Sequence, residues 1–167
     1  MGNWYQSLHD HLWTFVGSLV GLSILAYLAV PMHLPLLAGS FGASALLLFG
    51  LHDSPFARPR NVLLGQMLPA FIGVICYHLL GLSWISLSLA GAFAILVMRV
   101  THTVHPPGGA TALIAVLGKA GWLFVVMPIG AGALILIGVA YVINNMAPHR
   151  SYPLWTAKRA PSTSAME

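Results

Sequence analysis

Three long stretches of this chain carry no charged residue. Asp, Glu, Lys and Arg are absent between Asp10 and Asp53, between Arg60 and Arg99, and between Lys119 and Arg150. A helix that crosses a bilayer needs about 20 apolar residues, so each of the first two stretches can hold two spans. Charged residues make up only 6% of the chain, too few to cover a soluble core. The sequence therefore predicts an all-α, polytopic transmembrane helical bundle.

Prolines, glycines and polar loops divide these stretches into six apolar segments. We expect spans over residues 12–30, 36–51, 62–80, 84–98 and 122–143, with a polar loop at 52–61 and a shorter segment at 108–118. Residues 1–11 then form a cytoplasmic N-terminus, residues 12–146 a single transmembrane domain, and residues 147–167 a polar, flexible C-terminal tail.

The basic residues predict the orientation in the membrane. Arg58 and Arg60 lie in the polar loop, and the tail carries Arg150, Lys158 and Arg159. Lys and Arg are enriched on the cytoplasmic side of membrane proteins, so both groups are expected there. If every apolar segment crosses once, the chain makes six crossings with both termini in the cytoplasm, and only Lys119 lies on the opposite face.

The segment at 108–118 is too short to cross the membrane as a regular helix. Its 11 residues would extend about half of a 30 Å hydrocarbon core. Pro106 and Pro107 precede it, and prolines cannot extend a helix through themselves. We therefore expect a half-helix that follows a stretch of irregular backbone, which membrane depth tolerates only where protein or water satisfies it.

A second copy of this segment lies earlier in the chain. FGASALLLFG at residues 41–50 resembles GGATALIAVLG at 108–118, so that Gly42 and Ser44 match Gly109 and Thr111. An apolar span precedes and follows each copy. The chain thus reads as two inverted-topology repeats, each with a short or broken helix. The alternative is that the small residues only allow close helix packing.

Two half-helix starts near the middle of the membrane would suit a small anion. A helix start offers unpaired N–H groups and a partial positive charge, and the hydroxyls of Ser44 and Thr111 add donors. No carboxylate lies in any apolar segment, which disfavours a cation site or a carboxylate proton relay. We predict no catalytic residue, enzyme activity or cofactor. The substrate-binding candidates are Ser40, Phe41, Gly42, Ser44, His105, Pro106, Pro107, Gly108, Gly109 and Thr111.

Two histidines leave a further alternative open. His102 and His105 are three residues apart and could share a metal or a haem. No third ligand is evident nearby, so we predict no metal site and expect both rings to bond irregular backbone at the cytoplasmic mouth. Arg99 could either attract anions or anchor its helix at the headgroups.

The motifs together resemble one known family. HPPGGATAL at residues 105–113, RPRN at 58–61 and SFGASALLLFG at 40–50 match the signature blocks of the HPP family of integral membrane proteins. The family more commonly has Ala at position 108 and often His at position 66, where this chain has Gly108 and Gln66. Some relatives also carry a C-terminal CBS domain, for which this chain is too short.

The resemblance implies a function. Chloroplast and cyanobacterial members are known as nitrite transporters, so it implies a transporter or channel for nitrite or a similar anion in a bacterial cytoplasmic membrane. The expected partners are the anion, the lipid bilayer and a second copy in a homodimer, with no nucleic acid. The competing hypotheses are a non-transporting membrane subunit or sensor for a partner enzyme, and a histidine-based metal or haem redox protein.

Overall fold

The computed structural model describes residues 3–30 and 37–153, which are helical and contain no strand, so the all-α prediction is confirmed. The elements in chain order are α1 (Asn3–Ala29), α2 (Leu37–Ala45), the π-helical turn η1 (Leu46–Gly50), the 3-10 turn η2 (Pro55–Ala57), α3 (Pro59–Leu80), α4 (Trp84–Val100), α5 (Pro107–Leu117), the π-helical turn η3 (Val125–Gly130) and α6 (Ala131–Met146).

The helices of this bundle fall into two groups by length. Leu8–Ala29, Pro59–Leu80 and Val125–Met146 are apolar and long enough to cross a membrane, whereas Gly39–Gly50, Trp84–Val100 and Pro107–Leu117 are shorter. All six predicted segments are therefore helical, and the half-helix lies within one residue of its predicted bounds. Because three segments are short, length alone does not support six equal crossings.

Local sequence explains most of the helix boundaries. Pro59 occupies the first turn of α3, where its missing N–H costs nothing. Gly81, with φ of 63°, ends α3, and a capping box between Ser83 and Ser86 starts α4. Helix α1 begins at Asn3, before the span expected over residues 12–30, since no Gly or Pro interrupts residues 3–12.

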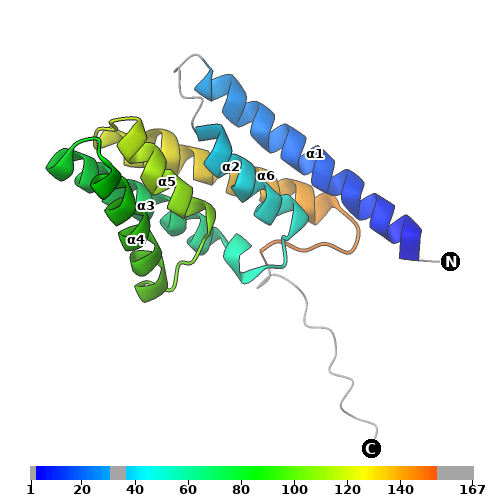
Figure 1. Ribbon diagram of the computed structural model, residues 1–167. Helices are drawn as coiled ribbons and strands as arrows, with labels where there is room; N and C mark the ends of the chain where they lie inside the picture. The colour runs from blue at the N-terminus through cyan, green and yellow to red at the C-terminus, as the bar shows by residue number, and fades with distance from the viewer. Residues whose placement is uncertain (1–2, 31–36, 154–167) are drawn as a thin grey trace, which may run out of the picture.

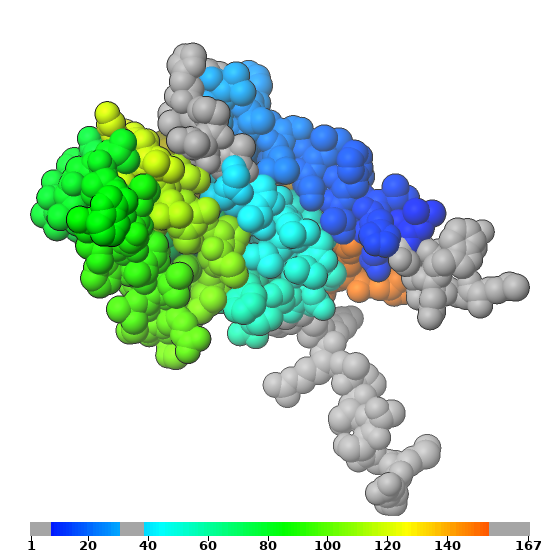
Figure 2. Space-filling model, viewed as in Figure 1, coloured from blue at the N-terminus to red at the C-terminus, as the bar shows by residue number. Residues whose placement is uncertain are grey.

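The two shortest of these helices, α2 and α5, are called the short helices below, and they lie between an outer helix on each side, α1 and α4 (Figure 1). Helix α1 packs against α2, η1 and α6, while α4 packs against α5 and α3. Helices α2 and α5 contact each other, as do α3 and α6. In the space-filling view α1 runs along one flank and α4 covers the other, with α2 and η1 between them (Figure 2).

The segment after α6 belongs to the packed structure. Tyr152 is buried and donates its hydroxyl to the Ala57 carbonyl at 2.8 Å. The Arg150 side chain is only 4% exposed and pairs with Asp10 at 3.1 Å. The first seven residues of the predicted tail therefore include buried side chains, those of Ala147, Tyr152 and Pro153, while residues 154–167 lie outside the described residues. The first turns of α1 and the end of α6 share one end of the molecule (Figure 1).

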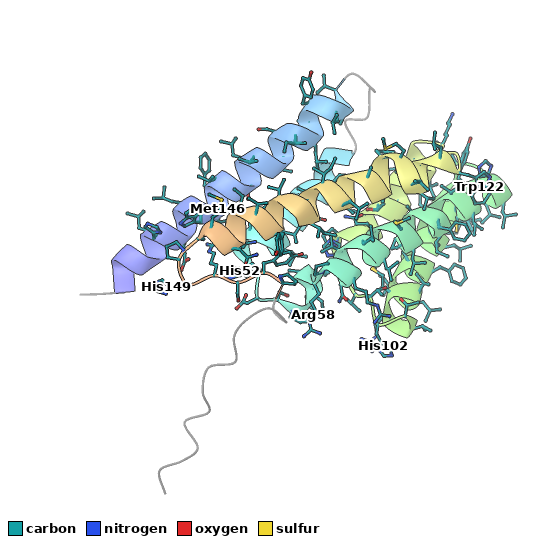
Figure 3. All side chains as sticks on the ribbon, turned by 180° about the vertical axis from the view of Figure 1, so that it is seen from behind. His52, Arg58, His102, Trp122, Met146 and His149 are labelled. Atoms are coloured by element: carbon teal, nitrogen blue, oxygen red, sulfur yellow. The ribbon has the colours of Figure 1, made fainter. Side chains whose placement is uncertain are left out.

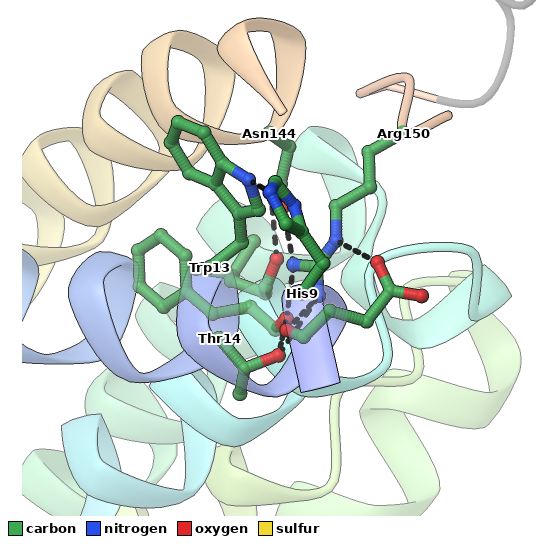
Figure 4. A network of polar contacts seen from close by, with 8 residues as sticks. His9, Trp13, Thr14, Asn144 and Arg150 are labelled. Carbon is green, nitrogen blue, oxygen red and sulfur yellow. Dashed lines mark hydrogen bonds and ion pairs between the residues drawn. The ribbon is translucent and has the colours of Figure 1, made fainter. Parts of the chain in front are cut away.

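A network of polar contacts centred on Arg150 holds this end together (Figure 4). The guanidinium donates to the Phe49 carbonyl at 2.9 Å, to Thr14 Oγ1 at 3.0 Å and to Asn144 Oδ1 at 3.3 Å. The Phe49 carbonyl lies at the C-terminal end of η1, where a positive charge is favourable. Arg150 thus joins η1 and α6 to the N-terminal half of α1.

Candidate functional site

Five polar side chains meet in the interior, between the two short helices. Ser40 and Ser44 come from α2, Gln66 from α3, Thr111 from α5 and His105 from the loop before α5, and all five are fully buried. Gln66 lies at the centre of this polar cluster. Its Nε2 donates to Ser40 Oγ at 3.0 Å and to Ser44 Oγ at 2.8 Å, and its Oε1 accepts from the hydroxyls of Ser40 and Thr111.

Helices α2 and α5 run antiparallel where they contact in the polar cluster. Ser40 Oγ lies 2.6 Å from Thr111 Oγ1 and 3.1 Å from the Pro107 carbonyl, whereas Ser44, one turn later in α2, contacts His105. The start of α2 therefore lies beside the first two turns of α5, and the next turn of α2 lies beside the loop that carries His105. Sequence analysis placed Ser40, Ser44, His105 and Thr111 among the binding candidates, and the structure brings all four together.

His105 is fixed by a hydrogen bond at each ring nitrogen. Its Nε2 lies 2.8 Å from Ser44 Oγ, and its Nδ1 lies 2.9 Å from the Phe56 carbonyl. A carbonyl only accepts, so Nδ1 carries a proton and a neutral ring accepts from Ser44 at Nε2. Burial lowers the pKa of His105 to about 4, although the bond to the Phe56 carbonyl opposes this shift. The ring is therefore neutral at physiological pH.

Helix α5 begins in close contact with the backbone of α3. A Cβ added at Gly108 would lie 1.8 Å from the Gly65 carbonyl oxygen, and one added at Gly65 would lie 2.5 Å from His105 Cβ. Farther along the pair, a Cβ at Gly73 would lie 2.3 Å from the Ala112 carbonyl oxygen. In this chain none of the three positions has room for a Cβ unless one of the two helices shifts, and this approach fixes the start of α5 beside the polar cluster.

One expectation about the start of α5 was wrong. Its first turn does not present unpaired N–H groups, because Pro106 and Pro107 have none and the N–H groups of Gly108 and Gly109 donate to the carbonyls of His105 and Pro106. Gly109 also makes no close approach, since a Cβ added there would meet no atom within 4 Å. Of the two adjacent glycines, only Gly108 therefore lies against another backbone.

The remaining candidates lie around the polar cluster but not in it. Phe41 is buried in the apolar core, with its ring against Gly132 of α6. Gly42 is partly exposed, and a Cβ added there would also meet nothing within 4 Å. Pro106 is exposed, whereas Pro107 is buried and supplies the carbonyl that accepts from Ser40.

The sequence copies at α2 and α5 have the same pattern of burial. The buried residues of α2 and η1 include Ser40, Phe41, Ser44, Ala45, Leu48 and Phe49, and their counterparts Pro107, Gly108, Thr111, Ala112, Ala115 and Val116 are buried in α5. Gly65 of α3 and Gly132 of α6 are separated in the sequence by the same number of residues as Phe41 and Gly108, so they match as well. The contact of Gly65 with Gly108 is then matched by the contact of Gly132 with Phe41, each joining one half of the chain to the other.

The cytoplasmic mouth predicted from sequence carries exposed basic side chains. Arg58, Arg60, Arg99 and His102 are all exposed, and Figure 3 shows Arg58 and His102 at one side of the molecule, with Trp122 far from both. Arg60 reaches the Thr101 carbonyl at 3.4 Å. Within the described ranges no three His, Cys, Asp or Glu side chains come together as a metal site, and both ring nitrogens of His105 are engaged.

Sequence reasoning missed Gln66 as a member of the site. Position 66 was named only because the resembled family often has a histidine there. A stronger signal was available in the chain itself. Gln66 is the only amide side chain between residues 62 and 143, and an uncharged polar side chain in an apolar span needs a hydrogen-bond partner within the bundle.

Known proteins match this chain over most of its length. The family model for the transmembrane region of HPP proteins matches residues 4–153. Two transmembrane proteins of Dictyostelium discoideum are 40% and 37% identical to it over 155 residues, which cover 86% of this chain and 54% and 50% of those proteins. The chain thus spans about half the length of these curated relatives.

No solved structure matches the chain significantly. The family match therefore stands on sequence, and it extends from the first turns of α1 to the last packed residue of the segment after α6. It includes both short helices and every residue of the polar cluster. This chain belongs to the HPP family of transmembrane proteins.

Proposed function

We propose that this protein is a transporter or channel for a small inorganic anion, with nitrite as the first candidate. The observation that carries the proposal is the polar cluster between the two short helices. It offers hydroxyl and amide donors and contains no carboxylate, so it suits an anion better than a cation. Fully buried polar side chains in an apolar bundle are costly, and within membranes they commonly mark a substrate pathway.

The arrangement of the helices supports the same proposal. Transporters built from inverted repeats bind substrate at the repeat interface, near short or broken helices. Here α1, α2 and α3 would form one unit and α4, α5 and α6 the other. The contacts of α1 with α2 and α6 then correspond to those of α4 with α5 and α3. The matched burial of α2 and α5 agrees with this pairing, which places the polar cluster between the units.

The resting arrangement would be a closed one. Every polar side chain of the cluster is fully buried, and among the described residues no buried side-chain polar atom lacks a hydrogen-bond partner. Transport therefore requires the short helices to separate, so that the anion replaces hydrogen bonds now made within the cluster. We also propose that both termini are cytoplasmic in a bacterial inner membrane, because this places the basic side chains near His105 on that side.

Nitrite flux into liposomes that contain the purified protein tests the function. We expect flux well above that of protein-free liposomes, and a loss of most of it in the Ser44→Ala, Thr111→Val double variant. Ser88→Ala removes an exposed hydroxyl of α4 and should transport as wild type does. Absence of flux for nitrite, nitrate and chloride alike would contradict the proposal and favour a non-transporting membrane subunit.

A further inference from the structure

Gln66 is the side chain of the polar cluster that comes from α3 and bonds hydroxyls of both short helices. It bonds both hydroxyls of α2 through Nε2 and the hydroxyl of α5 through Oε1, so it links the two short helices from a third helix. Pro69 lies three residues later in α3 and has no N–H to give to the Gly65 carbonyl. Gln66 thus lies within a helix turn that lacks one backbone hydrogen bond.

The cluster contains donors but no formal charge. Its donors are the two N–H groups of Gln66 and the hydroxyls of Ser40, Ser44 and Thr111. His105 is neutral, and its one N–H group already donates to the Phe56 carbonyl. The basic side chains of Arg58, just before α3, Arg60 in α3 and Arg99 in α4 are exposed rather than turned into the cluster. An anion placed here would therefore be stabilised by dipoles alone.

We propose that Gln66 coordinates the transported anion and that this uncharged donor set restricts transport to monovalent anions. The inference rests on the proposed function. The cost of transferring an ion from water into a medium of low dielectric constant rises with the square of its charge, so a divalent anion costs about four times as much as a monovalent one of similar size. At most five neutral donors and no cation are available to offset that cost.

Gln66 is the residue whose replacement makes this selectivity measurable. The Nε2 group now donates to two serine hydroxyls, so an anion that enters beside it can accept from Nε2 and from both hydroxyls once they turn. Gln66→Glu keeps the size of the side chain but replaces the donor with a carboxyl group. When that group is ionised it repels an anion, and when it is protonated it can again donate.

The experiment compares anions and pH values in proteoliposomes. For wild type we expect nitrate and nitrite flux at least tenfold above sulfate flux (about 1.4 kcal/mol in barrier height). For Gln66→Glu we expect nitrate flux to fall at least tenfold near pH 7.5 and to recover several-fold near pH 5, as the carboxyl protonates. Nitrate is the probe at acid pH, because protonated nitrite crosses lipid without a protein.

Asn145→Asp is the matched control. It makes the same amide-to-acid change in the last turn of α6, where the Asn145 side chain is exposed and bonds Tyr152 outside the cluster. Its nitrate flux should stay within about twofold of wild type at both pH values, as expected of a change made outside the anion path. Gln66→Met, which has neither donor nor charge, should reduce nitrate flux at every pH without recovery.

Each outcome decides the inference. Sulfate flux equal to nitrate flux in wild type overturns the charge selectivity while the transport function stands. Wild-type nitrate flux in Gln66→Glu near pH 7.5, or a loss without recovery near pH 5 in a variant of unchanged thermal stability, overturns the role of Gln66. If Gln66→Glu does not fold, wild-type flux in Gln66→Met overturns that role. No flux of any anion removes the proposed function, and this inference with it.

Discussion

Helices α2 and α5 share a burial pattern but are fixed by different means. Helix α5 is held by backbone, since Gly108 lies directly on the Gly65 carbonyl. Helix α2 is held by a side chain, since the Phe41 ring lies where Gly132 leaves room for it. A backbone contact has little freedom to adjust, whereas a ring can change rotamer or withdraw. If one of the short helices moves during transport, this difference favours α2.

Gly108→Ala should have the largest effect on the contact between α5 and α3. The new Cβ would lie 1.8 Å from a carbonyl oxygen, and neither backbone can shift without displacing a helix. We expect destabilisation above about 3 kcal/mol, which corresponds to a melting temperature in detergent lower by about 10 °C. Fluorescence-detected size exclusion after heating measures it. A melting temperature within two or three degrees of wild type would refute the backbone contact.

Phe41→Ala tests the other half of the comparison. The ring is 4% exposed and packs in the core that joins α2 to α6, so its removal leaves a cavity that should cost about 3 kcal/mol. Phe41→Leu should cost less than about 1.5 kcal/mol. Phe93→Ala removes a half-exposed ring from α4 and is the control for losing an aromatic side chain. Equal thermal stability of Phe41→Ala and Phe93→Ala would show that the ring does not hold α2.

His105 links the two short helices and should give a pH dependence. Its pKa is about 4 in the folded protein and about 6.5 when unfolded. The unfolded chain therefore binds more protons between these values, and the stability due to the neutral ring is fully present above pH 6.5 and is lost as the pH falls towards 4. Near pH 5 the loss should be about 2 kcal/mol.

The pH dependence is measured as a difference between variants, because burial also lowers the pKa of His52 and gives the protein a second source of pH dependence. His105→Gln keeps hydrogen-bonding capacity but does not titrate, so its thermal stability should fall less than that of wild type between about pH 7 and pH 5. Transport by this variant should remain substantial, whereas His105→Leu should lose it. Parallel stability profiles for wild type and His105→Gln would mean that the buried ring is not the source.

The smallest effect is expected at the paired glycines Gly42 and Gly109. A Cβ at either position would meet no atom within 4 Å, so Ala at each site gains helix propensity without a clash. We expect Gly42→Ala and Gly109→Ala each to stabilise the protein by up to about 1 kcal/mol. If either variant lowers both the melting temperature and transport, that glycine contacts a group that is absent from the closed arrangement, such as the anion.

Sequence patterns predicted the positions of the helices better than the contacts between them. Charge-free stretches and prolines locate six apolar helices, because membrane insertion acts on local composition. Which of two adjacent glycines touches another backbone is a tertiary property, so the choice between Gly108 and Gly109 could not be made from the chain alone. The packed segment around Arg150 was missed for a related reason, since its composition resembles that of a tail while its partners lie far away in the sequence.

The sequence predicted those residues of the candidate site that belong to local motifs, and it missed those whose role depends on tertiary contacts. The repeated small-residue motif identifies Ser44 and Thr111, and the double proline identifies the loop that carries His105. Gln66 belongs to neither motif, and its place among them depends on how α3 crosses both short helices. The N–H groups in the first turn of α5 donate to carbonyls of the preceding loop. The conformation of that loop cannot be predicted from amino-acid composition.

The clamp at Arg150 has a consequence for how the protein is made. Asp10 and Arg150 are 140 residues apart, so α1 is synthesised long before the residue that clamps it. Until then α1 can contact the rest of the chain where Thr14 donates to the Phe49 carbonyl and where Gly17 lies against the Phe49 ring. Final closure of the bundle therefore waits for the synthesis of Arg150, and a nascent chain arrested before that residue would hold α1 in the membrane without this clamp.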